Sequence, residues 1–212
     1  HRCIAMDHIG FGLSDKPEHW SYTPEAHARN YRKLLEHLGI GRFSLVVHDL
    51  GGPIALAHAV EHPEKIARIS AVNSFMWSVK NDPLFVKFDH KVNGPMGKMA
   101  LTTTPLGLNK MLHDMVEQKQ KVNSRIFPQY SGPYAKASDR QGPYGLAKGY
   151  VGSSQWLYDI WAHREALAGI PLQVIWAMKD SLFTNEHLDK WRHNWPNAEI
   201  VTFPDCGRLV VE

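Results

Sequence analysis

The stretch VVHDLGGP, residues 46–53, decides the fold. The apolar run at residues 43–48 (FSLVVH) predicts a buried strand, and residues 53–61 (PIALAHAVE) predict a helix. One polar residue and two glycines between them predict a sharp strand-turn-helix with Asp49 at its apex. The helix N-terminus then favours an ionised Asp49, and the Leu50 N–H becomes a donor for developing negative charge. A plain helix cap is the alternative reading of Asp49.

Outward from this turn, apolar runs alternate with helical patterns. The helical patterns cover residues 24–38, after an N-cap at Thr23, and residues 185–195. Further strands are expected at residues 2–6, 65–73, 171–177 and 199–203. Strands that alternate with helices predict an α/β fold with a mostly parallel sheet flanked by helices.

Residues 74–169 break this alternation, because they are rich in methionine, aromatic residues and proline. We expect them to form a helical cap inserted between two strands of a core made by residues 1–73 and 170–212. Ligands of doubly wound sheets bind beyond the carboxyl ends of the strands. A cap that leaves from that edge would cover the site as a lid, and a second packing layer without a binding role is the alternative.

Composition excludes several classes of protein. Hydrophobic residues make up 43% and charged residues 21% of 212, as in soluble globular proteins. The net charge of +3 comes from scattered basic residues, which argues against nucleic-acid binding. No apolar run approaches the ~20 residues of a membrane span, and no signal peptide is visible, so we expect a cytoplasmic protein.

Metal and cofactor motifs are weak. Cys3 and Cys206 form no CxxC pair, which argues against a disulfide framework and a cysteine zinc site. Residues 58–62 (HAVEH) match the H-x-x-E-H zinc pattern, but a chain with 13 histidines makes such a coincidence easy. Residues 10–12 (GFG) lack the third glycine of a dinucleotide loop. We therefore expect neither a metal nor a cofactor.

Several segments in chain order resemble the α/β-hydrolase fold, and specifically the haloalkane dehalogenases. Besides the turn at 46–53, the matching segments are residues 7–17 (DHIGFGLSDKP), 125–141 and 155–157 in the cap, 176–183 (WAMKDSLF) and 204–207 (PDCG). The resemblance implies that Asp49 is a nucleophile. Its carboxylate would displace halide from a small apolar halogenated substrate and form an alkyl ester, which water then hydrolyses. It also implies that Asp180 is the acid that orients a histidine, since Asn73, at the alternative position, is not acidic.

The chain departs from this family at three places. Arg208 stands where the water-activating histidine is expected, and a guanidinium has no lone pair with which to act as a base. Leu50 stands where a halide-binding tryptophan is expected. The family's loop and central strand before His1 are missing, as is its last helix, so we expect a longer parent chain. Arg208 is expected to pair with Asp180 and to place a cation near Asp49.

These departures leave alternatives open. An epoxide hydrolase uses the same aspartate chemistry with two cap tyrosines, for which Tyr130 and Tyr134 are candidates. Trp77 or Trp156 could supply an indole N–H from the cap, although packing is the commoner role. A non-catalytic, decayed relative is the competing class. The sequence does not define the oligomeric state.

Overall fold

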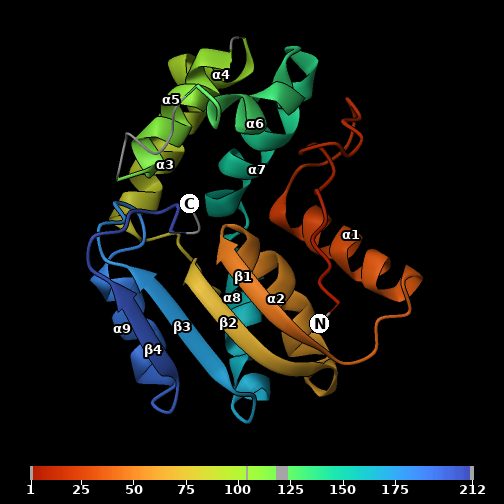
Figure 1. The fold of residues 1–212 in the computed structure, drawn as a ribbon, viewed down its shortest axis with the longest axis vertical. Helices are drawn as coiled ribbons and strands as arrows, with labels where there is room; N and C mark the ends of the chain where they lie inside the picture. Colours follow the sequence, from red (N-terminus) through yellow and green to blue (C-terminus); the bar gives the residue numbers. More distant parts are fainter. Residues whose placement is uncertain (1, 104, 118–123, 211–212) are drawn as a thin grey trace.

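The computed structural model describes residues 2–103, 105–117 and 124–210. Four parallel strands form one sheet in the order β1-β2-β3-β4 (Figure 1). They are β1 (Phe43–Asp49), β2 (Ile66–Ser74), β3 (Leu172–Ala177) and β4 (Glu199–Phe203). Since all four run in one direction, their carboxyl ends meet at one edge of the sheet. The predicted α/β fold class is confirmed.

The strand expected at residues 2–6 is wrong. This stretch lies outside any sheet, and residues 2–5 are exposed. An apolar run becomes a strand only where another strand satisfies its backbone hydrogen bonds, and no strand that the structure describes pairs with it.

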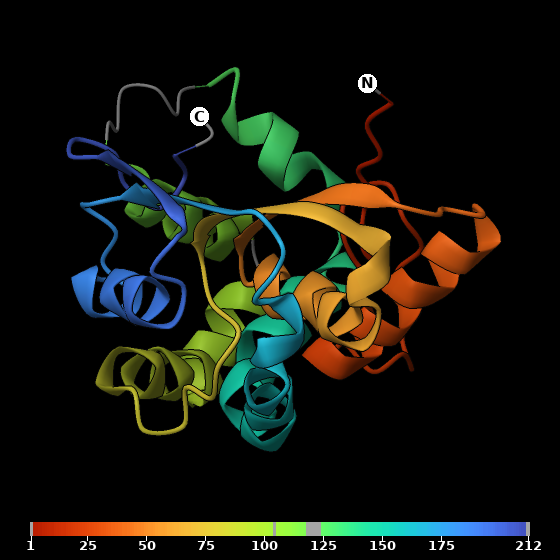
Figure 2. The same cartoon turned by 90° about the horizontal axis from the view of Figure 1, so that it is seen from below.

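Four long helices lie on one face of the sheet (Figure 2): α1 (Pro24–His37), α2 (Gly51–Glu61), α8 (Ser154–Ala162) and α9 (Asn185–Asn194). Alternate side chains of β1, such as Leu45 and Val47, are buried against them. Val46 points to the opposite face and is 73% exposed. The core therefore sits between the sheet and this one helical layer.

The remaining helices belong to the segment between β2 and β3, here called the inserted segment. They are α3 (Pro83–Asn93), α4 (Pro95–Thr102), α5 (Pro105–Met115), α6 (Phe127–Ser131) and α7 (Gln141–Gly152), with short 3-10 turns at Gly132–Tyr134 (η3), Ser138–Arg140 (η4) and Arg164–Leu167 (η5). A further 3-10 turn, η1 (Pro63–Lys65), lies outside this segment, between α2 and β2. Helices α3 to α7 stand beyond the carboxyl edge of the sheet (Figure 1). In contrast, α8 and η5 return to the sheet layer and pack against α2.

Helix α7 packs against residues 10–24 through a face made of glycines. A Cβ atom at Gly142, Gly145 or Gly149 would lie 2.5, 2.5 and 2.8 Å from atoms of residues 10, 22 and 24, respectively. These distances are shorter than any ordinary carbon contact, so only glycine allows the two backbones to approach this closely.

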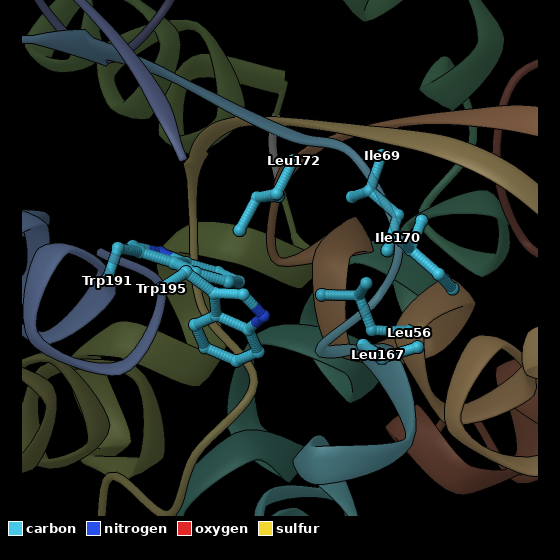
Figure 3. Close-up of a pocket in the computed structure, with 7 residues that line it drawn as sticks. All are labelled: Leu56, Ile69, Leu167, Ile170, Leu172, Trp191 and Trp195. Carbon is cyan, nitrogen blue, oxygen red and sulfur yellow. The ribbon is translucent and has the colours of Figure 1, made fainter. Parts of the chain in front are cut away.

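An apolar pocket lies at the other end of the sheet (Figure 3). Its lining residues come from α2, β2, β3, η5, α9 and the residues that follow η5 and α9. They are Leu56, Ile69, Leu167, Ile170, Leu172, Trp191 and Trp195. Leu172 begins β3, whereas Asp49 ends β1, so this pocket is remote from the turn that sequence analysis singled out. Among the described residues, no helix combines the length and apolarity that a membrane span requires.

Candidate active site

The turn at the end of β1 has the strained geometry that the sequence predicted. Asp49 has a φ of +52°, in the left-handed region that few residues other than glycine adopt. The Ser74 hydroxyl donates to the Asp49 carbonyl at 2.7 Å and fixes the turn to β2. A Cβ on Gly52 would lie 1.8 Å from Ser74 Oγ, whereas one on Gly51 would meet open space. Gly52, and not Gly51, is therefore required for the close approach of this turn to Ser74.

The Asp49 carboxylate is held through a single oxygen. Its Oδ1 accepts the Leu50 N–H at 2.6 Å and Arg208 Nη2 at 2.7 Å. The side chains of Asp49 and Arg208 are 16% and 10% exposed, so this charge-assisted contact is largely shielded from water. No donor in the described residues bonds Oδ2. The Leu50 N–H, expected to face developing charge, is already bonded to the carboxylate.

The predicted Arg208–Asp180 pair is wrong, because Arg208 reaches Asp49 instead. Asp180 is saturated by other donors: Oδ1 accepts the backbone N–H groups of residues 182 and 183 at 2.8 and 3.1 Å, and Oδ2 accepts Asn73 Nδ2 at 3.1 Å. Burial raises the pKa of Asp180, and the nearby Arg208 cation opposes this shift. Its local contacts make Asp180 a brace for the turn after β3.

Asn73 ties the ends of β2 and β3 together. Its side chain is fully buried, with Oδ1 accepting the Ala177 N–H at 2.6 Å and Nδ2 donating to the Ala177 carbonyl at 3.2 Å and to Asp180. Its φ of +33° is left-handed, as at Asp49. Sequence analysis considered Asn73 only as a missing acid and overlooked this role, although a polar residue at a strand end is a recognisable signal.

The loop that carries Arg208 crosses from β4 toward β1. The Lys179 N–H donates to the Cys206 carbonyl at 3.0 Å, and His48 Nε2 lies 2.9 Å from the Arg208 carbonyl. The guanidinium carbon lies 5.1 Å from the centre of the Phe183 ring. Arg208 is 8% exposed and therefore belongs to the interior of the site.

Tyr150 of α7 is a site residue that sequence analysis missed. Its hydroxyl donates to the Leu50 carbonyl, and the residue is 1% exposed. Burial raises its pKa well above the usual value; the charges of Asp49 and Glu25 add to this shift, and Arg208 opposes it. Tyr150 thus connects the inserted segment to the turn at Asp49. It lies among small residues of α7 that show no site motif.

The cap residues that the sequence suggested make other contacts. The Tyr134 hydroxyl accepts the Gly12 N–H at 3.4 Å, and Tyr130 is 37% exposed. The Trp77 ring stacks on His187 with 6.1 Å between centres, and Trp156 packs against the main core. The Tyr134 hydroxyl is thus occupied by a backbone N–H, which does not support its role in the tyrosine pair of an epoxide hydrolase. The contacts of the two tryptophans are packing contacts and do not support an indole donor.

The two histidines of the H-x-x-E-H match, His58 and His62, also make packing contacts. The His58 and His62 rings lie 4.8 Å apart, and His58 is buried next to Tyr31 and Phe43. Across the described parts of the chain, no three His, Cys, Asp or Glu side chains gather in a way that could hold a metal ion.

Comparison with known proteins agrees with this geometry. The family model of the alpha/beta hydrolase fold matches residues 1–212. The chain is 29% identical to cis-3-alkyl-4-alkyloxetan-2-one decarboxylase of Shewanella oneidensis and 26% identical to haloalkane dehalogenase 2 of Mycobacterium tuberculosis. Both alignments cover the whole chain, and they cover 69% and 73% of these relatives.

Solved structures give the same fold. Haloalkane dehalogenase DbeA from Bradyrhizobium elkani superposes with a TM-score of 0.81 at 18% identity, over 95% of this chain and 72% of that one. The expected resemblance to the haloalkane dehalogenases is confirmed among both the relatives and the solved structures. The chain belongs to the alpha/beta hydrolase fold family.

Proposed function

We propose that this chain displaces halide from a small apolar haloalkane through the Asp49 carboxylate. The observation that carries the proposal is the left-handed Asp49 at the end of β1, with a carboxylate that is bonded through one oxygen only. Such a turn presents the second oxygen toward a substrate. The dehalogenase relatives supply the reaction class.

In the first step, Asp49 Oδ2 forms a bond to the carbon that bears the halogen. The carbon–halogen bond breaks, and halide leaves with the bonding electrons. Oδ1 stays with the Leu50 N–H and Arg208, which orient the carboxylate. The product is free halide and a neutral alkyl ester on Asp49. The Leu50 side chain offers the departing halide no hydrogen bond, so we expect this step to be slow.

In the second step, water has to attack the ester, and this needs a base. Arg208 occupies the position of the expected histidine and carries no lone pair at accessible pH. Loss of a general base slows a reaction by typically 10²–10⁴-fold. We therefore expect one halide per chain, followed by a persistent ester.

Incubation with a 1-bromoalkane tests both steps. Peptide mass spectrometry should find the alkyl group on Asp49, and bromide release should stop at one equivalent. An Asp49→Asn variant, which keeps the shape of the side chain, should give neither signal. An adduct on another residue, or no adduct on a folded chain, would reject the proposal and favour a non-catalytic relative.

A second candidate is favoured by Arg208 itself, namely decarboxylation of an oxetan-2-one, the activity named for one relative. Attack by Asp49 on ring carbon C4 breaks the C4–O bond and releases a carboxylate, which the Arg208 cation stabilises. Loss of CO₂ then forms the C3–C4 double bond as the C4–O bond to Asp49 breaks. This cycle regenerates Asp49 without a base.

The two candidates give different products. A cis-3,4-dialkyl oxetan-2-one should yield alkene and CO₂ over many turnovers if the second candidate holds, without an accumulating ester. If the chain converts this lactone to no alkene but forms the bromoalkane ester, only the first candidate remains.

A further inference from the structure

We propose that His48 is a positioning residue for whatever side chain stands at position 208, an inference that rests on the proposed function. The consecutive residues His48 and Asp49 hold the two ends of Arg208. Asp49 binds the guanidinium, and His48 binds the main-chain carbonyl. Neither the family match nor the charge pattern assigns this role to His48.

The hydrogen bond defines the state of the imidazole. A carbonyl oxygen only accepts, so His48 Nε2 carries the proton and donates it at 2.9 Å. The bond joins residues 160 positions apart, one on β1 and one on the loop that follows β4, which are the two edges of the sheet (Figure 1). It therefore anchors the far end of a loop that crosses the carboxyl edge.

The neighbouring positions of the loop are fixed independently. The Cys206 carbonyl accepts the Lys179 N–H at 3.0 Å, and a Cβ on Gly207 would lie 2.9 Å from the Glu117 nitrogen. Residue 208 thus follows two fixed positions, and the His48 hydrogen bond holds its own carbonyl. Because His48 bonds the main chain, its hold does not depend on the side chain at 208.

Loss of the donor would free the peptide group after residue 208 to rotate. The side chain at 208 would then be held near Asp49 by its own contact alone. A displacement of about 1 Å in a catalytic group can cost on the order of 10²-fold in rate. Substrate binding should change little, because the His48 hydrogen bond is made to the loop backbone.

The kinetic test uses an Arg208→His background, in which a base is restored and turnover is measurable. Adding His48→Leu should lower kcat 10- to 100-fold with KM within about twofold. His48→Gln should restore kcat to within about threefold, because its side-chain amide also donates. His48→Asn, whose amide falls short of the carbonyl, is the second loss variant, and exposed His193→Leu is the matched control. Equal kcat values in all four variants would overturn the inference. So would a His48→Gln variant that is as slow as His48→Leu although the two have equal melting temperatures.

A second measurement needs no reaction and uses the unmodified chain. Nitrogen NMR should show His48 protonated on Nε2, and the Arg208 guanidinium protons should exchange slowly with water. Exchange should accelerate at least tenfold in His48→Leu and remain slow in His48→Gln and His193→Leu. Unchanged exchange in His48→Leu would refute the positioning role. If the NMR result holds while no variant forms an ester, the proposed function fails and the positioning inference stands.

Discussion

Asp49 and Asp180 are both acids at the carboxyl ends of parallel strands, yet the structure treats them differently. Asp49 is left-handed, its side chain is 16% exposed, and its carboxylate is bonded through one oxygen. Asp180 is 5% exposed and accepts hydrogen bonds on both oxygens, two of them from the backbone. Hydrogen-bond saturation therefore separates a carboxylate available for chemistry from one that braces a turn. The family resemblance alone implied catalytic roles for both.

The largest expected effect separates the two carboxylates by activity. Asp49→Asn should abolish ester formation, a loss on the order of 10⁴-fold or more, as for removal of other nucleophiles. Asp180→Asn should retain measurable ester formation, because Asp180 touches backbone and amide groups rather than Arg208. Initial bromide release measures both, and equal losses in the two variants would erase the distinction.

Arg208→His should give the next largest effect. An imidazole at this position can accept a proton from water, so ester hydrolysis should accelerate by roughly 10²–10⁴-fold. Bromide release should then continue beyond one equivalent per chain. An Arg208→Gln variant removes the cation without adding a base and serves as the control. Sustained turnover by the unmodified chain would show that another group activates water.

Removal of the Asp180 carboxylate should affect stability. Asp180→Ala leaves the N–H groups of residues 182 and 183 and Asn73 Nδ2 without their acceptor. Unmade buried bonds cost about 1–3 kcal/mol each, and we expect a net loss of about 3 kcal/mol in the free energy of unfolding. Urea denaturation measures it, with exposed Asp189→Ala as the matched control, expected within about 0.5 kcal/mol.

The smallest expected effect is a pH dependence of the stability that Asp180 contributes. Because burial raises the pKa of Asp180 from 3.8, the folded state binds its proton more tightly than the unfolded state. The stability from this group is complete below pH 3.8 and is lost as the pH rises through the folded-state pKa. The stability difference between the unmodified chain and Asp180→Asn should therefore narrow with rising pH, by about 1.4 kcal/mol per unit of pKa shift. A constant difference would contradict burial as the cause.

Local patterns predicted most of the fold. The strand-turn-helix at residues 46–53 and the strands near 66, 172 and 199 follow from apolar runs bounded by turn residues. The error at residues 2–6 has a clear reason, because strand formation depends on a partner that a local pattern does not specify.

The site was predicted less completely. Arg208 lies near Asp49 as expected, but its ion-pair partner was predicted wrongly. A long side chain can reach either of two acids, and Asp180 is already occupied by other hydrogen-bond donors. Tyr150 escaped prediction because its contact joins residues 100 positions apart without a motif. Sequence analysis considered only that Asn73 lacks the charge of an acid. Its structural role depends instead on the hydrogen-bond donor and acceptor of its side-chain amide.

The glycine face of α7 has a consequence for the order of assembly. Each glycine inside a helix destabilises it by about 0.5–1 kcal/mol relative to alanine, so α7, with Gly142, Gly145 and Gly149, is a poor helix in isolation. It gains its stability when residues 10–24 dock against those glycines. Since α7 carries Tyr150, we expect the hydrogen bond from Tyr150 to the Leu50 carbonyl to form only after that docking. We therefore expect that docking of residues 10–24 precedes completion of the turn at Asp49 during folding.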